Sequence, residues 1–333
     1  MKFHKFGILI ILLWGAGNLF AQDPIFSQFY ASPLQLNPAF AGNAYAPFIA
    51  ANYRIQAPSF VSGSAAYSTY QVSYDQFLDG LNSGIGLSFM SDDQAGGIYK
   101  TTYANAYYSY KVNITEQISS KIGIQVGLIQ PSIDWNRLTF PDQIDGGTGN
   151  INPSAEDRPA SLTNGKLDIS SGILVYGPSF YVGVTAKHLS SPNQSFIKSN
   201  NPNVNVGLPL LINFHAGYDI TIEKETRYRP ATFITPSILY ARQSDFAQIV
   251  VGAYGGIGPL YLGTWYRHAN ANPDAVIAMV GYRQEYFKIG YSYDYTISGL
   301  GGKTGGTHEI SLTINFDPNP QRVDINDCFK IFR

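Results

Sequence analysis

The chain has 333 residues, a formal net charge of −1 and 14% charged residues, against roughly 25% in an average soluble domain. Aromatic residues make up 14%, with 24 Tyr and 20 Phe, and Gly contributes 33 residues. Mean hydropathy is −0.08, whereas the continuous apolar spans of a helical membrane protein would raise it. The balance of charges provides no basic surface for nucleic acid. Low charge, many tyrosines and neutral hydropathy together favour strands in which apolar and polar residues alternate.

The first 21 residues have the layout of a secretory signal peptide. Lys2 and Lys5 precede an apolar run from Phe6 to Trp14, and the expected cut lies between Ala21 and Gln22. The apolar run is too short for a membrane-spanning helix, which needs about 20 residues. Because no later window is long and apolar enough for such a helix, the mature chain is expected to be an exported soluble protein or a transmembrane barrel.

Alternation with a period of two residues dominates the mature chain. In residues 287–295, one face carries Phe287, Ile289 and three tyrosines, and the other carries Lys, Gly, Ser and Asp. Residues 81–89, 122–128 and 309–316 follow the same rule. About 14 such runs are present, most of them roughly 8–11 residues long, which suits tilted strands that cross a bilayer. The expected strands centre near residues 51, 70, 86, 105, 124, 172, 184, 215, 237, 249, 264, 278, 291 and 312.

The connections between these runs differ in length. Residues 130–166 and 189–209 form the two longest, whereas Gly177-Pro178 and residues 283–285 are short links. If the mature N-terminus lies in the periplasm, both long connections fall outside the cell and the short ones inside, as in outer-membrane barrels. The polar strand faces carry few charges, which suits a narrow, partly filled lumen. The alternative is a secreted all-β protein such as a propeller, although no repeat of 20–50 residues has a fixed motif.

Residues 22–42 do not alternate, and their sequence is distinctive. They read Gln-Asp-Pro-Ile-Phe-Ser-Gln-Phe-Tyr-Ala-Ser-Pro-Leu-Gln-Leu-Asn-Pro-Ala-Phe-Ala-Gly. This resembles the start of mature PorP/SprF proteins, whose pattern is close to QDPxFSQYMxNPLxxNPAxAG. Phe29-Tyr30 replaces the usual Tyr-Met, and Ser32 replaces the usual Asn. Residues 293–298 and 307–312 also look like the end of the family, so the resemblance spans essentially the whole mature chain.

The resemblance implies an outer-membrane β-barrel of a Gram-negative bacterium that works with the type IX secretion and gliding apparatus. It implies a part in the surface display of a large secreted adhesin that carries a C-terminal sorting domain. The implied partners are this adhesin, periplasmic or peptidoglycan-linked secretion components and outer-membrane lipid, and no catalysis is implied. The rival hypothesis is a passive channel or small-molecule transporter, because a barrel of about 14 strands is wide enough to conduct unless it is plugged.

The expected organisation is a signal peptide (1–21), an N-terminal segment (22–47), a barrel (48–316) and a periplasmic tail (317–333). Three prolines prevent helix formation in the N-terminal segment, and its aromatic residues need burial in the lumen or at the periplasmic mouth. We therefore expect a plug, or a plug that also presents a docking surface, and an outer contact surface on the long loops. The candidate partner-binding residues are Phe26, Gln28, Phe29, Tyr30, Asn37, Pro38, Phe40, Trp135, Phe140, Phe196 and Ile197.

No catalytic, cofactor or metal site is expected. The five histidines lack metal-ligand spacing, and the motif at residues 301–304 lacks the first Gly that a phosphate-binding loop needs. The single cysteine, Cys328, is expected to be an inert tail residue or to pair with another chain. The charged run at residues 223–229 is interpreted as a solvated turn or as a contact for a periplasmic partner.

Overall fold

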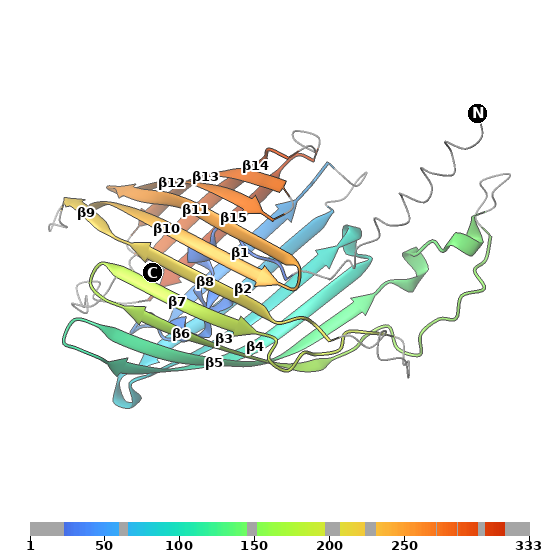
Figure 1. The fold of residues 1–333 in the computed structure, drawn as a ribbon, viewed down its shortest axis with the longest axis horizontal. Helices are drawn as coiled ribbons and strands as arrows, with labels where there is room; N and C mark the ends of the chain where they lie inside the picture. The colour runs from blue at the N-terminus through green and yellow to red at the C-terminus, as the bar shows by residue number, and fades with distance from the viewer. Residues whose placement is uncertain are drawn as a thin grey trace.

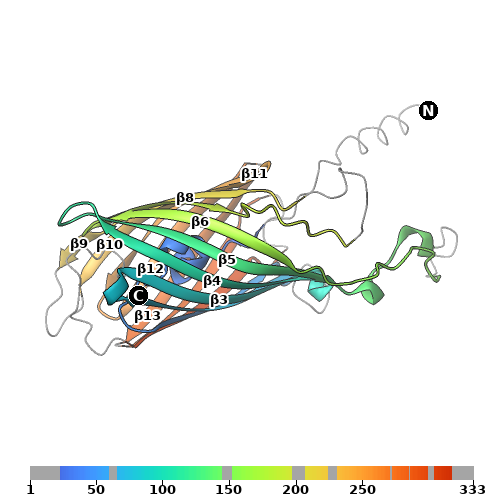
Figure 2. The same cartoon turned by 90° about the horizontal axis from the view of Figure 1, so that it is seen from below.

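The computed structural model describes residues 23–59, 66–144, 152–196, 207–223, 231–270, 272–284, 286–298 and 304–316. These residues form a closed antiparallel β-barrel, with a short N-terminal segment inside it (Figures 1 and 2). β8 and β9 pair with successive parts of β10, so they act as one interrupted strand and the barrel has 14 strands around its wall. The predicted fold class and strand number are therefore confirmed. The predicted signal peptide, the predicted C-terminal tail with Cys328 and the loop residues 301–303 lie outside the described residues.

Each predicted strand centre lies within one of the observed strands. The strands are β1 (Phe48–Gln56), β2 (Tyr67–Leu78), β3 (Ser83–Gln94), β4 (Tyr99–Asn113), β5 (Ser119–Ile133), β6 (Lys166–Tyr176), β7 (Phe180–Lys187), β8 (Leu211–Tyr218), β9 (Ile220–Glu223), β10 (Thr232–Gln243), β11 (Phe246–Ile257), β12 (Leu260–Ala269), β13 (Asn272–Gln284), β14 (Phe287–Thr296) and β15 (Thr307–Asn315). β1 closes the ring by pairing with β15.

The alternating faces point out of and into the barrel as expected. On β14, Phe287, Ile289 and Tyr291 are exposed on the outside, whereas Ser292 and Asp294 are buried inside. One detail of the prediction is wrong, because β3 starts at Ser83 and not near residue 81. Residues 79–81 form a single 3-10 turn, and Asn82 adopts a left-handed conformation with φ of 48° that ends the turn and starts the strand. Such a conformation interrupts the pleat.

The two ends of the barrel differ in the length of their connections. The longest connections, residues 134–165 and 188–210, both lie at one end, which we call the long-loop end. The hairpins between β2 and β3, β6 and β7, and β11 and β12 lie at the opposite, short-turn end. Because outer-membrane barrels have long external loops and short periplasmic turns, the long-loop end faces outward.

The N-terminal segment passes through the barrel interior from one end to the other. Asp23 contacts His188, which directly follows β7 at the long-loop end. At the short-turn end, the Pro47 carbonyl accepts a hydrogen bond from the Phe316 amide, and β1 begins at the next residue. The expectation that the mature chain starts on the periplasmic side is therefore wrong for Asp23. Asp23 lies at the long-loop end because its buried polar partners, His188 and Gln243, are there.

This path predicts that the start of the mature chain is accessible from outside the cell. An epitope inserted directly before Asp23 should bind antibody on intact cells. The same epitope inserted at Glu116, in the exposed β4–β5 turn at the short-turn end, should bind antibody only after the outer membrane is permeabilised. Equal dependence on permeabilisation at both positions would contradict the path.

Candidate functional site

The N-terminal segment consists of three short turns joined by extended residues. A 3-10 turn at Phe29–Ala31, a four-residue helix α2 at Pro33–Leu36 and a second 3-10 turn at Pro38–Phe40 follow each other directly. The expectation that proline excludes helix here is wrong at α2. Pro33 and Pro38 each stand in the first helical position, where the missing amide proton costs nothing and the fixed φ favours the turn.

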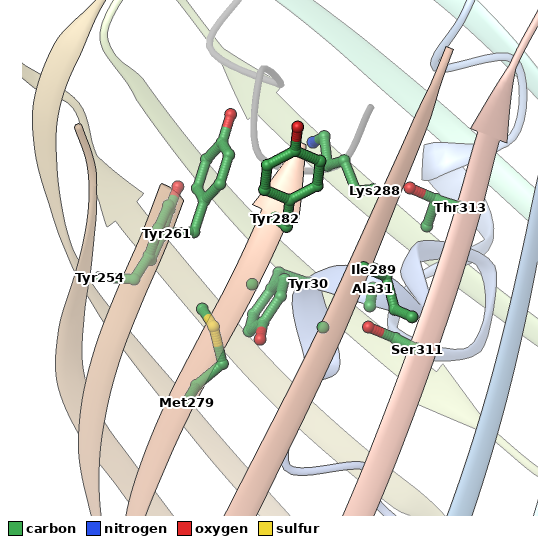
Figure 3. Close-up of a pocket in the computed structure, with 12 residues that line it drawn as sticks. Tyr30, Ala31, Tyr254, Tyr261, Met279, Tyr282, Lys288, Ile289, Ser311 and Thr313 are labelled. Carbon is green, nitrogen blue, oxygen red and sulfur yellow. The ribbon is translucent and has the colours of Figure 1, made fainter. Parts of the chain in front are cut away.

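The aromatic residues of the segment are buried in the lumen, with Phe26, Phe29, Tyr30 and Phe40 all less than a tenth exposed. Tyr30 stacks on Tyr254 and on Trp265, with ring centroids 5.8 and 5.7 Å apart. Figure 3 shows Tyr30 among inward side chains of the wall. The cavity beside it has a volume of about 40 Å³, room for only one or two water molecules. Aromatic packing thus fixes the middle of the segment against the β11–β13 side of the wall.

Glu309 of β15 holds the backbone of the segment near the long-loop end. Its two carboxylate oxygens accept hydrogen bonds from the amides of Ser27, at 2.9 Å, and Gln28, at 2.8 Å. The Ser27 hydroxyl donates to Asp294 Oδ2 at 2.6 Å, and Arg267 Nη1 donates to the same oxygen at 2.8 Å. All these groups are buried. Without these hydrogen bonds, their donors and acceptors would have no water to bind and would destabilise the fold.

The Gln28 side chain is 1% exposed and bonded at both ends of its amide. Nε2 donates to Ser292 Oγ at 3.1 Å and to the Glu309 carbonyl at 3.0 Å, and Oε1 accepts from Ser311 Oγ at 2.7 Å. Arg54 of β1 donates to the Ile25 carbonyl. Residues 25–28 are therefore bound to β1, β14 and β15, the strands that close the barrel.

Asn37 holds the centre of the segment against the opposite side of the wall. Its Oδ1 accepts from the Ala39 amide at 2.8 Å, and its Nδ2 donates to the carbonyls of Ile173 at 3.1 Å and Val184 at 3.3 Å. The wall has glycine where the segment approaches most closely. A Cβ on Gly123 would lie 2.2 Å from the Ala39 nitrogen, a distance that no side chain tolerates.

A third group of contacts lies near the short-turn end. Lys121 of β5 is 3% exposed, and its Nζ donates to the carbonyls of Ala41, at 3.2 Å, and Gly42, at 2.8 Å. The Asn43 amide donates to Asp75 Oδ1 at 3.0 Å. The segment is thus bound to the wall near both ends and in the middle.

At the long-loop end, His188 joins Asp23 to β6. Its Nε2 lies 2.5 Å from Asp23 Oδ2, and its Nδ1 lies 3.1 Å from Asp168 Oδ2. Burial lowers the pKa of His188, but the carboxylates of Asp23 and Asp168 outweigh burial and raise the pKa to about 9. Burial raises the pKa of Asp23, but His188 and then Lys187 outweigh it and leave the pKa below its ordinary value. The imidazolium is therefore the form that holds the start of the segment.

The raised pKa of His188 predicts that the start of the segment loosens as pH rises. The stabilisation from the His188 imidazolium is complete below pH 6.5, the pKa of histidine in the unfolded chain. It is lost as pH rises through about 9, the pKa in the folded protein. The protection factors of residues 23–28, which are exchange rates corrected for the base-catalysed intrinsic rate, should therefore fall between these values. The His188→Gln variant should exchange faster at pH 6.5 and lose this pH dependence. A variant with the wild-type pH profile would contradict the assignment.

The candidate residues on the long loops lie apart from the luminal site. Residues 134–144 and 152–165 form an arm that projects beyond the barrel (Figures 1 and 2). On this arm Trp135 and Phe140 pack together, with ring centroids 4.7 Å apart, and are half-buried rather than fully exposed. Phe196 packs edge-on against Tyr99, with centroids 6.4 Å apart, and Ile197 lies outside the described residues.

Sequence reasoning missed the wall partners of the segment. Arg54, Lys121, Asp294 and Glu309 are charged residues on the inward faces of predicted strands. A charge on a membrane-spanning strand is rare and generally needs a partner, so these positions carried a signal. Their partner, however, lies up to 282 residues away in the chain, and alternation does not reveal it.

A closed 14-stranded barrel with an apolar outer face and a bonded internal segment defines an outer-membrane β-barrel protein. The chain belongs to the family of type IX secretion system membrane proteins called PorP/SprF, whose model matches residues 18–314. It is an outer-membrane protein of the kind found in Gram-negative bacteria, and it works with the type IX secretion system. No curated protein sequence matches the chain.

Several solved structures are similar to this chain at low sequence identity. The Pseudomonas putida toluene transporter TodX is 11% identical, with a TM-score of 0.48, and the match covers 84% of this chain and 92% of TodX. A Pseudomonas aeruginosa FadL homologue is 12% identical, with a TM-score of 0.42, over 90% of this chain and 96% of that one. The Acinetobacter baumannii outer-membrane protein Omp33 is 7% identical, with a TM-score of 0.43, over 82% of this chain and 98% of that one.

Proposed function

We propose that this barrel anchors a large secreted adhesin at the cell surface by holding its C-terminal sorting domain. Membership of a type IX secretion family supports a role beside exported proteins. The observation that carries the proposal is the lumen, which a covalently attached segment crosses from Asp23 to Pro47 with buried contacts along its whole length. A segment bound in this way would obstruct a permanently open channel, so it disfavours the passive pore.

The segment is proposed to be a plug whose buried residues serve the barrel rather than an external partner. Phe26, Gln28 and Phe40 are less than 3% exposed, so no partner reaches them while the segment stays in place. The proposed contact surface is therefore the external arm, with Trp135 and Phe140. Paired aromatic side chains are common anchors at protein interfaces because they bury much apolar area at small entropic cost.

Replacing Trp135 and Phe140 with alanine should reduce the amount of adhesin retained on the cell surface. The expected loss is at least 2 kcal/mol of binding free energy for a true anchor, or roughly thirtyfold in affinity. Surface-retained adhesin is measured on whole cells and compared with that released into the medium. Ile114→Ala, at an exposed position of the β4–β5 turn at the short-turn end, is the matched control. Full retention in the double variant, with a barrel present at normal levels, would refute the contact surface.

The rival proposal of a passive channel or transporter is tested separately. Purified mature protein in planar bilayers should conduct little current while the segment stays bound. A steady open pore in the unmodified protein would favour transport. A silent barrel that co-purifies with a large surface protein would favour anchoring.

A further inference from the structure

The outer face of the barrel carries a groove that is separate from the lumen and from the external arm. It has a volume of about 660 Å³ and lies over β1 to β6, which are consecutive neighbours in the sheet. Figure 2 shows β3 to β6 side by side. Its apolar lining consists of outward-facing side chains, and none of its lining residues is charged. The lining side chains that project outward are Ile49, Val72, Tyr74, Leu87, Phe89, Ala104, Ala106, Val126, Leu128 and Leu167.

Strand register explains why a hollow forms on a convex surface. Ala104 of β4 lies between Phe89 of β3 and Leu128 of β5, and Ala106 lies between Leu87 and Val126 in the next row. Two methyl groups thus form a floor between two ridges of large side chains. The ridges stand about 10 Å apart, because neighbouring strands are separated by about 4.8 Å. After subtraction of the side-chain widths, the groove has the width of a single hydrocarbon chain.

The two ends of the groove are chemically different. Tyr108, 44% exposed on the same face of β4, follows Ala106 toward the short-turn end and blocks the floor there. Toward the long-loop end the floor continues past Thr102 to Lys100. The Lys100 ammonium donates to the Tyr70 hydroxyl at 3.2 Å and lies 3.6 Å from Asp93 Oδ1. An occupant therefore enters from the outward-facing half of the membrane, with its polar end near a cation.

We propose that this groove binds one acyl chain of an outer-leaflet lipid, with an anionic phosphate head group near Lys100. The groove lies in the apolar belt that contacts the membrane, so lipid is the component continuously present beside it. Lys100 lies about 14 Å from Ala104 along the strand, a span that places the head group at the interface while the chain lies on the alanine floor. Lys100 then bridges Asp93, Tyr70 and the phosphate.

The test counts lipids retained by the full mature barrel. Detergent-purified protein is incubated with dipalmitoylphosphatidylglycerol or dipalmitoylphosphatidylcholine and analysed by native mass spectrometry. Wild type should retain one lipid above background and prefer the phosphatidylglycerol. The Ala104→Leu/Ala106→Leu variant raises the floor to the height of its walls. Its affinity for both lipids should fall roughly tenfold, which corresponds to losing the burial of about two methylene groups.

Two further variants make the result specific. Ala278→Leu, at an exposed outward alanine of β13, should retain lipid like wild type. Lys100→Gln should lose the preference for phosphatidylglycerol. Equal retention by the groove variant and the β13 control would overturn the proposal, as would a lipid-free wild type that dimerises through the groove. An unchanged preference in Lys100→Gln would overturn the head-group assignment. Anchoring of the adhesin is measured on cells and does not depend on these outcomes.

Discussion

Replacing Glu309 with alanine is expected to release residues 23–28 from the wall. The substitution leaves the buried amides of Ser27 and Gln28 without acceptors. Each unsatisfied donor costs on the order of 1–3 kcal/mol, and Arg54, whose charge is buried in the same region, loses a nearby opposite charge. With this end free, only the aromatic packing and the contacts of Asn37 and Lys121 hold the segment in the lumen. The segment should then leave the lumen more often, and the variant should also admit ions.

The measurements are single-channel conductance and proteolysis of the segment in detergent. Glu309→Gln is the matched control, because it keeps the size of the side chain and one acceptor oxygen. It should show a smaller loss of stability and less current than Glu309→Ala. If Glu309→Ala passes no more current than wild type and its segment resists proteolysis equally well, Glu309 does not hold the segment.

Adding a single methyl group at Gly123 is expected to displace the centre of the segment. In Gly123→Ala the new Cβ would overlap the Ala39 backbone at 2.2 Å, and neither backbone yields without breaking hydrogen bonds. The segment should then leave the lumen, and the contacts of Asn37 should be lost with it. We expect increased conductance and protease cleavage within residues 30–45.

A second inward glycine provides the control. In Gly281→Ala the nearest atom, the Ile289 carbonyl oxygen, would lie 3.2 Å from the new Cβ, a contact that a shift of a few tenths of an ångström relieves. This variant should fold and remain closed. Equal behaviour of the two variants would show that close packing of the segment against β5 is not required.

The sequence by itself determined the wall of the barrel. Period-two alternation is a local property, since successive side chains of a strand point to opposite faces. Residues 287–295 and 309–315 therefore revealed both their strands and their lipid-facing sides. The N-terminal motif identified the family because its 21 residues are contiguous, so it can be recognised without knowledge of the fold. The long connections also followed directly from the spacing between strands.

Only the tertiary structure decided where the N-terminal segment runs and what holds it. Glu309 and Gln28 are 281 residues apart, and the alternating pattern is the same whichever partner an inward carboxylate finds. The direction of the segment was predicted wrongly because its end at Asp23 is fixed by His188 and Asp168, which no local pattern connects to it. The groove over Ala104 and Ala106 depends likewise on strand register, which places alanines beside large residues from two other strands. Pairing of distant residues is a product of barrel closure, and closure is a property of the whole chain.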